Sequence, residues 1–178
     1  MKVVYNLGTS AKGDNLQRVC GVTLDVLSKR GHSVIPIDRN SPCIGCRACH
    51  NIKGCVLEHD KENSNLLATS NVIMVFSPIY FFGLCSTAKL FLDRLYGTNL
   101  TGKVLCFVTI SGSPSDSRYC GVDLIDEMAQ RTAEYCGCYT VPTLNICTGD
   151  GYIDAYQYLK EVRAFIRSVE GKYNEVSG

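Results

Sequence analysis

Short apolar runs alternate with longer amphipathic stretches along most of this chain. Five of the runs predict β-strands, over residues 2–7, 33–37, 72–76, 104–110 and 139–144. Most of them are continuously apolar or β-branched, which is typical of strands that helices cover on both faces. The alternation therefore predicts an α/β chain in which right-handed crossovers connect parallel strands.

The stretches between these runs have the i, i+3, i+4, i+7 spacing of helices that bury one face. Four of them stop at a glycine, a common signal for a helix end: Gly31, Gly97, Gly137 and Gly171. A shorter and more polar helix is expected over residues 61–70. The predicted architecture has three layers, with a five-stranded parallel sheet in the common order 2-1-3-4-5 and helices on both faces.

The length of 178 residues suits one domain, and no repeat or linker interrupts residues 1–173. Residues 174–178 are expected to be frayed. The formal net charge of +1 argues against nucleic acid or an anionic membrane as a partner. Because no apolar run approaches the roughly 20 residues of a membrane span, and no signal peptide is recognisable, we expect a cytoplasmic protein.

Open α/β sheets bind ligands beyond the carboxyl ends of their strands, where the strand order reverses. In the predicted order this place lies between strands 1 and 3, which directs attention to the loops that begin at Gly8, Ser77 and Ser111. The first loop combines small and hydroxyl residues with a helix N-terminus, and this combination favours a phosphate group. The alternative is an ordinary polar turn in which Asp14 caps the helix.

The second loop, residues 77–83, contains three consecutive aromatic residues, Tyr80, Phe81 and Phe82. Such a loop is difficult to solvate and favours a flat apolar partner such as a flavin. Packing under a neighbouring helix or subunit is the alternative. The third loop, residues 111–115, is small enough for backbone donors to approach a ring system, although by itself it reads as a plain turn.

Four of the eleven cysteines are clustered in loop-like sequence: Cys43, Cys46, Cys49 and Cys55. The Cys-x2-Cys-x2-Cys run can direct three thiolates at one polynuclear centre, and we expect it at the same sheet edge as the ligand. Zinc is one alternative, with His50 or His59 as a further ligand, and thiols without a metal are another. Six of the remaining cysteines lie singly in apolar segments and are expected to be small buried hydrophobes: Cys20, Cys85, Cys106, Cys136, Cys138 and Cys147.

Three segments resemble motifs of the NAD(P)H-dependent FMN reductases and occur in matching order over residues 1–115. Residues 8–15 resemble the phosphate loop of that family. Residues 77–83, followed by Lys89 and by Asp93-Arg94, resemble its flavin loop. The cysteine run resembles the compact motif of the iron–sulfur flavoproteins within the same group. Asp93 and Arg94 are expected to form a structural pair.

The resemblance implies a flavodoxin-like fold that binds FMN non-covalently, in a homodimer or homotetramer whose neighbouring subunit helps to close the flavin site. The sequence departs from the phosphate motif at Ala11, where the family has Arg, and at Leu16, where it has Thr or Ser. The residues implied around the phosphate are Thr9, Ser10, Lys12, Asp14 and Asn15. Those implied around the ring are Pro78, Ile79, Tyr80, Phe81, Phe82, Gly83, Ser111, Gly112 and Ser113.

The expected function is that of an FMN-dependent oxidoreductase with NAD(P)H as the reductant. By resemblance it is an iron–sulfur flavoprotein, in which the four clustered cysteines hold one [4Fe–4S] cluster and ferredoxin is a plausible redox partner. No catalytic side chain is predicted, because hydride transfer to a flavin needs no protein acid or base. The alternatives are a plain FMN reductase without metal, a flavodoxin-like electron carrier with an acidic docking face, and a non-catalytic signalling domain.

Overall fold

The computed structural model describes residues 1–9, 14–37, 41–51, 55–56, 61–149 and 151–178. Its strands are β1 (Lys2–Leu7), β2 (Ser33–Pro36), β3 (Val72–Tyr80), β4 (Gly83–Leu84), β5 (Val104–Ser111), β6 (Tyr139–Thr140) and β7 (Leu144–Cys147). Its α-helices are α1 (Asn15–Lys29), α2 (Lys61–Thr69), α3 (Ser86–Asp93), α4 (Val122–Cys136) and α5 (Leu159–Ser177). Two 3-10 helices are also present, η1 (Ala48–His50) and η2 (Ala155–Tyr158).

The strands form one sheet whose main path runs in the order β2-β1-β3-β5-β6. Each pair along this path is parallel. Two strands lie off the path, since β7 pairs in parallel with β5 and β4 pairs antiparallel with β3. Over the described residues, the expectation of five strands in the order 2-1-3-4-5 is therefore corrected to seven strands. Of these, β4 was not foreseen, and β7 extends beyond the end of the strand expected over residues 139–144.

The difference at the end of the sheet has a local cause. The strand expected over residues 139–144 is divided, because β6 pairs beside Val104 and β7 pairs beside Val108. Pro142 lies between the two pieces and has no N–H to donate, so a continuous ladder is interrupted there. The neighbouring Val141 turns its side chain into the core instead.

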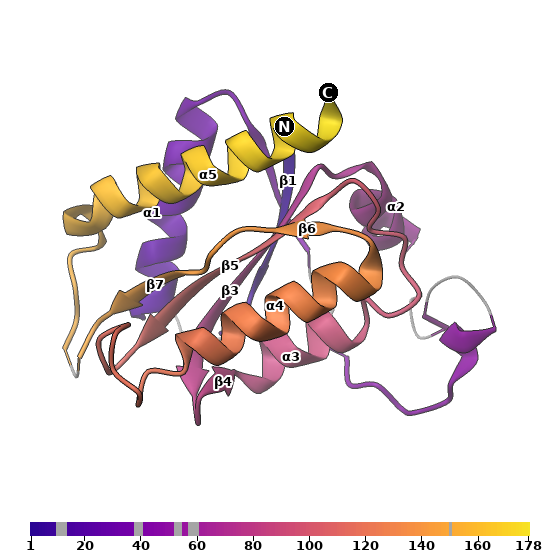
Figure 1. The fold of residues 1–178 in the computed structure, drawn as a ribbon, viewed down its shortest axis with the longest axis horizontal. Helices are drawn as coiled ribbons and strands as arrows, with labels where there is room; N and C mark the ends of the chain where they lie inside the picture. Colours follow the sequence, from indigo (N-terminus) through magenta and orange to yellow (C-terminus); the bar gives the residue numbers. More distant parts are fainter. Residues whose placement is uncertain (10–13, 38–40, 52–54, 57–60, 150) are drawn as a thin grey trace.

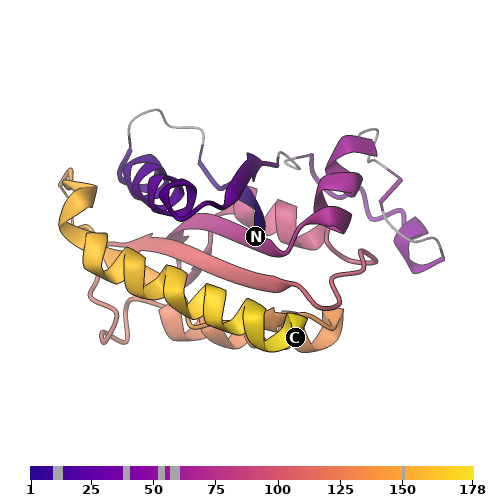
Figure 2. The ribbon, with the colours of Figure 1, turned by 90° about the horizontal axis from the view of Figure 1, so that it is seen from above.

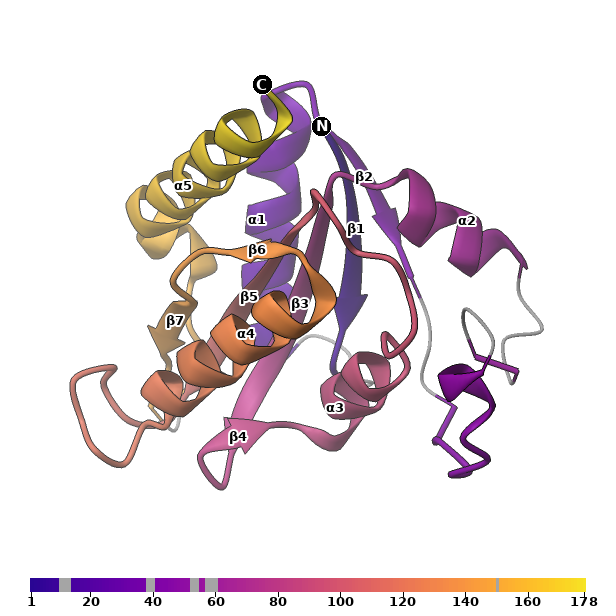
Figure 3. The same ribbon diagram turned by 45° about the vertical axis from the view of Figure 1, so that its right-hand side comes forward.

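The sheet lies between two layers of helices, as Figures 1 and 3 show. Helices α1 and α5 share a core with Val3 and Phe76, whereas α2, α3 and α4 share a core with Val4 and Val75. Successive side chains of a strand point to opposite faces, so β1 and β3 each contribute to both cores. This double burial explains why their sequences are continuously apolar, and it confirms the predicted three-layer α/β architecture.

Two of the predicted helix ends are confirmed. Gly31 follows α1 with φ 81°, and Gly137 ends α4 with φ 68°. Helix α5 instead continues through Gly171 to Ser177, so the expected stop at Gly171 is wrong, and residues 174–177, where fraying was expected, belong to the helix. Tyr173 packs against the core under α1 and α5, which keeps these last turns in place. Within the described ranges, no helix is long and apolar enough to cross a membrane.

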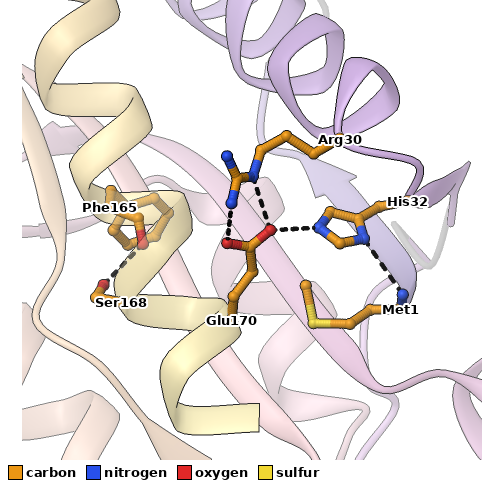
Figure 4. A network of polar contacts seen from close by, with 6 residues as sticks. All are labelled: Met1, Arg30, His32, Phe165, Ser168 and Glu170. Carbon is orange, nitrogen blue, oxygen red and sulfur yellow. Dashed lines mark hydrogen bonds and ion pairs between the residues drawn. The ribbon is translucent and has the colours of Figure 1, made fainter. Parts of the chain in front are cut away.

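A polar network ties α5 to the end of α1, on the amino-terminal side of the sheet (Figure 4). The Arg30 guanidinium donates two hydrogen bonds to the Glu170 carboxylate, at 2.8 and 2.6 Å. Nε2 of His32 lies 2.7 Å from the same carboxylate, and its Nδ1 lies 3.3 Å from the amino nitrogen of Met1. One carboxylate therefore joins the last helix to the α1–β2 turn.

We expect Glu170→Gln to lower the free energy of unfolding at neutral pH by about 1 kcal/mol, the usual contribution of such a hydrogen bond. The hydrogen bonds from Arg30 hold the pKa of Glu170 below its usual range. A carboxylate with a lowered folded-state pKa stabilises the protein above its unfolded pKa of about 4.3 and loses this effect as the pH falls through the folded-state pKa. The difference between wild type and variant in urea unfolding should thus shrink below about pH 4. A difference that is constant from pH 7 to 3 would contradict this role.

Candidate functional site

A pocket of about 380 Å³ opens at the carboxyl edge of the sheet, and we call it the sheet-edge pocket. It is lined by Asp14, Asn15, Pro78, Tyr80, Ile110, Gly149, Gly151 and Tyr152. These residues come from β3 and β5 and from the segments after β1 and β7. The pocket therefore lies where sheet topology predicts a ligand. The residues after β7 were not predicted, because the motifs that carry the family resemblance end before them.

Asp14 is the N-cap of α1, the role that the alternative interpretation of this loop gave it, and its place as a phosphate contact stays a prediction. Its Oδ1 accepts the backbone N–H of Gln17 at 2.8 Å, and its Oδ2 accepts the hydroxyl of Thr9 at 2.7 Å. In this arrangement the Thr9 hydroxyl donates to Asp14 and not to a bound anion. Ser10 and Lys12, the other predicted phosphate contacts in this loop, lie outside the described residues.

Asn15 joins the start of α1 to the segment after β7. Its Nδ2 donates to the carbonyl of Gly151 at 2.7 Å, and its Oδ1 accepts the N–H of Ile153 at 3.0 Å. The Arg18 guanidinium lies 5.4 Å from the centre of the Tyr152 ring, a cation–π distance. The two hydrogen bonds of Asn15 thus connect the two segments that form one wall of the sheet-edge pocket. Sequence reasoning had placed it only as a phosphate donor.

Leu16 explains one departure from the family's phosphate motif. Its side chain is fully buried in the core under α1 and α5. A hydroxyl at this position would lie among apolar side chains. In this chain the position is instead occupied by a leucine that packs in the core. Ala11, the other departure, lies outside the described residues.

The aromatic loop forms a tight hairpin between β3 and β4, with Tyr80 paired to Gly83. Its two central residues, Phe81 and Phe82, have φ values of 48° and 64°. Left-handed backbone at both central positions is typical of a type I′ turn and is rare for bulky residues. Gly121 permits this packing, since a Cβ there would lie 2.5 Å from the Phe82 Cα. The Phe81 side chain is 100% exposed at the tip.

The predicted ring-contact residues divide between two pockets. Pro78 and Tyr80 line the sheet-edge pocket. The others line a separate pocket of about 230 Å³, the hairpin pocket, with Tyr119 and Cys120: Ile79, Phe81, Phe82, Ser111, Gly112 and Ser113. Alternate residues of β3 point to opposite faces, which separates Ile79 from Pro78 and Tyr80. Gly83 lines neither of these pockets and serves to pair β4 with β3.

Asn145 organises the loop after β5, a role that no sequence motif indicated. Its Nδ2 lies 2.9 Å from the Ser111 and Ser115 hydroxyls, and its Oδ1 accepts the Thr109 hydroxyl at 2.9 Å. These bonds fix the backbone that borders the hairpin pocket. Because Asn145 enters from β7, only the sheet pairing could reveal the contact.

The four clustered cysteines line one small cavity of about 30 Å³, which we call the four-cysteine cavity. All four are free thiols: Cys43, Cys46, Cys49 and Cys55. Asp93 and Arg94, at the end of α3, line the same cavity. Asp93 was expected to pair with Arg94. In the structure it forms an ion pair with Lys89 instead. Within the described segments, no three Cys, His, Asp or Glu side chains converge closely enough to hold an ion.

This cavity fits a thiolate-bound centre in its donor set, because four cysteines line it. The loop geometry does not itself bring the sulfurs into a coordination arrangement. Left-handed backbone at Gly45 and Arg47, with φ values of 66° and 57°, winds the run tightly enough for its cysteines to share one cavity. The residues present therefore suit an iron–sulfur cluster, because they are cysteines and because all four line the same cavity.

The four-cysteine cavity and the sheet-edge pocket have no lining residue in common. The segment with η1 lies beyond α2 and α3 at one end of the molecule, whereas the loops after β5 and β7 lie at the other end (Figures 1 and 2). The cysteines follow the carboxyl end of a strand, as expected, but their cavity is separate from the sheet-edge pocket. They follow β2, which lies at the outer edge of the sheet, and β1 and β3 separate it from β5.

Most of the isolated cysteines are buried, as predicted: Cys20, Cys85, Cys106 and Cys138. Burial raises the pKa of Cys20 to about 12 and that of Cys138 to about 11, so these thiols stay protonated. Cys136 and Cys147 are only partly buried, which corrects the expectation for these two. Cys136 lines a larger cavity of about 460 Å³ beside the four-cysteine segment, between α3 and α4.

Comparison with known proteins matches residues 1–145 to the family described as NADPH-dependent FMN reductase. An iron–sulfur flavoprotein from Methanosarcina thermophila is 27% identical over 99 residues, which cover 53% of this chain and 52% of that protein. The chain spans about half the length of the curated relatives it matches, 52% of one and 50% of the other.

Solved structures share the fold at low sequence identity. The NAD(P)H:quinone oxidoreductase from Methanothermobacter marburgensis is 14% identical with a TM-score of 0.71, and the match covers 96% of this chain and 97% of that one. A flavodoxin from the domain Archaea is 15% identical with a TM-score of 0.59, covering 98% and 99%. These likenesses show a flavodoxin-like fold.

Proposed function

Because the chain belongs to the NADPH-dependent FMN reductase family, we propose that it is an FMN-dependent oxidoreductase reduced by NAD(P)H. The observation that carries the proposal is the sheet-edge pocket, which lies at the reversal of strand order. Its volume of about 380 Å³ lies within the range of about 300–1,000 Å³ of small-molecule sites. FMN, when bound, accepts a hydride and releases electrons singly or in pairs.

The chain's own residues bind and orient the cofactor in this proposal. The N-terminus of α1 favours an anion through its dipole, which suits the FMN phosphate. Tyr80 and Tyr152 line the same pocket and offer flat rings to the isoalloxazine. Pro78 and Ile110 add apolar wall that excludes water from the ring. Asn15 holds the Tyr152 segment in place through its two hydrogen bonds.

We expect Tyr152→Ala to weaken FMN binding about tenfold, because it removes ring contact and burial that together stabilise the complex by about 1.4 kcal/mol. Titration of the apoprotein with FMN, followed by quenching of flavin fluorescence, measures the dissociation constant. Tyr156→Ala is the matched control, since Tyr156 is an exposed tyrosine in η2 that does not line the sheet-edge pocket. If the two variants bind FMN with equal affinity, Tyr152 does not contact the flavin.

We further propose that the four clustered cysteines hold one [4Fe–4S] cluster, so that the chain is an iron–sulfur flavoprotein. The proposal is supported by the four free thiols around one cavity and by the name of the curated relatives. A cluster there would supply single-electron transfer between FMN and a redox protein such as ferredoxin. Bound zinc or a metal-free loop would leave a plain FMN reductase.

The partners and location expected from the sequence belong to this proposal as well. A second copy of the chain, in a homodimer or homotetramer, would cover the exposed Phe81 tip of the hairpin. Sedimentation of the purified protein tests this, and a monomer would overturn it. No nucleic-acid or membrane partner is proposed, since the net charge of +1 attracts neither. A cytoplasmic location agrees with the eleven free cysteines.

Anaerobic purification followed by absorption spectroscopy and iron analysis tests the function as a whole. We expect bound flavin, bound iron, and oxidation of NADH or NADPH in the presence of a quinone or a protein acceptor. A protein without flavin overturns the oxidoreductase proposal. A protein that binds flavin but never consumes NAD(P)H is instead an electron carrier of the flavodoxin type.

A further inference from the structure

Arg94 is the buried cation of the four-cysteine cavity. Its exposed fraction is 6%, whereas Arg47, the other arginine that lines this cavity, is exposed to solvent. The negative charge of Asp93 at the cavity is offset by its ion pair with Lys89. Among the described residues that line the cavity, Arg94 is therefore the positive charge with the least screening by water.

The position of Arg94 is fixed by the fold. It is the C-cap of α3, and its N–H lies 3.3 Å from the carbonyl of Leu90 and 3.2 Å from that of Phe91. The side chains of Phe91 and Leu95 on either side of it are fully buried in the core under α2, α3 and α4. The carbonyl end of the helix favours a cation at this place. Arg94 is thus held in the wall of the cavity by the packing of its neighbours in the chain.

A centre held by four thiolates carries net negative charge, and each electron it accepts adds one more. The reduction potential of such a centre depends on net charge, hydrogen bonds to sulfur and solvent exposure. A nearby cation in a medium of low effective dielectric constant acts on this charge more strongly than a solvated one. It lowers the free energy of the reduced form more than that of the oxidised form.

We propose that Arg94 sets the reduction potential of the four-cysteine site, by stabilising the reduced form of the centre that Cys43, Cys46, Cys49 and Cys55 hold. The inference rests on the proposed cluster function and adds a residue from α3 that no cysteine motif contains. In this proposal the charge of Arg94 acts on the centre held by the four cysteines. The sequence had instead favoured a purely structural pair of Arg94 with Asp93.

The test is a reductive titration of the holoprotein with dithionite under nitrogen, monitored by the electron paramagnetic resonance signal of the reduced cluster. We expect Arg94→Gln to decrease the equilibrium constant for reduction at least tenfold, which equals a shift of about 59 mV to more negative potential for one electron. Arg94→Lys keeps the charge and should stay within about threefold of wild type.

Arg131→Gln is the matched control, because it removes the same charge from the neighbouring 460 Å³ cavity between α3 and α4. The Arg131 side chain is 76% exposed and pairs with Glu127 at 2.5 Å, so its removal should leave the potential unchanged. Equal shifts in Arg94→Gln and Arg131→Gln would overturn the inference, as would a wild-type potential in Arg94→Gln.

Iron content separates the remaining outcomes. Loss of iron in Arg94→Gln with retention in Arg94→Lys supports the charge as the decisive property. Loss of iron in both variants, with flavin retained, assigns Arg94 a structural role and overturns the inference. A wild-type protein that binds flavin but no iron overturns the cluster proposal itself, and the inference falls with it.

Discussion

Replacing Gly8 by alanine is expected to destabilise the protein by about 3 kcal/mol, at the upper end of the cost of overpacking a core. A Cβ at this position would lie 2.8 Å from both the Cys85 sulfur and the Phe76 carbonyl oxygen. The Gly8 N–H also donates to that carbonyl, at 2.8 Å. Because the oxygen belongs to β3, it cannot move without disturbing the pairing of β1 with β3. Urea unfolding, followed by circular dichroism, measures the loss.

The same substitution should weaken FMN binding, since Gly8 begins the segment that leads to the N-cap of α1. Gly21→Ala is the matched control, because nothing lies within 4 Å of a Cβ at this exposed position inside α1. Alanine there should stabilise the helix by up to about 1 kcal/mol. A Gly8→Ala protein within 1 kcal/mol of wild type would show that the β1–β3 contact can relax.

Replacing Cys46 by serine is expected to reduce bound iron from a full cluster to background, because a neutral hydroxyl is a poor substitute for a thiolate ligand. The bound FMN should be unchanged, since the four-cysteine cavity and the sheet-edge pocket share no lining residue. Iron, acid-labile sulfide and flavin, measured per polypeptide after anaerobic reconstitution, give all three stoichiometries from one sample.

Cys136→Ser is the control for this experiment. Cys136 is also a free thiol, partly buried where Cys46 is exposed. It lies outside the Cys-x2-Cys-x2-Cys run and lines the neighbouring cavity together with Cys43 and Cys49. Its replacement should leave the iron content at the wild-type level. Equal iron losses in the two variants would contradict the assignment of the cluster to the run, and zinc in place of iron in the wild type would contradict the cluster itself.

The candidate site could be predicted in part from residues that act locally. The N-cap role of Asp14 depends on the turn just before α1, and the sequence shows both. The cysteine run places its thiols in one cavity because its spacing and its left-handed residues wind a tight loop. Contacts between distant segments were not visible in this way. Asn15 meets Gly151, and Asn145 meets Ser111, in each case across at least one intervening strand and one helix.

The sequence by itself determined the three layers, since a strand buried on both faces must be apolar at every position while a helix buries one stripe. Only the tertiary structure decided that Arg94 lines the same cavity as the four cysteines and that the aromatic hairpin divides its side chains between two pockets. It also decided that the four-cysteine cavity is separate from the sheet-edge pocket. These facts depend on which strand lies at the edge of the sheet and on which face a side chain points to. Both follow from pairing between distant segments, which hydrophobic periodicity does not encode.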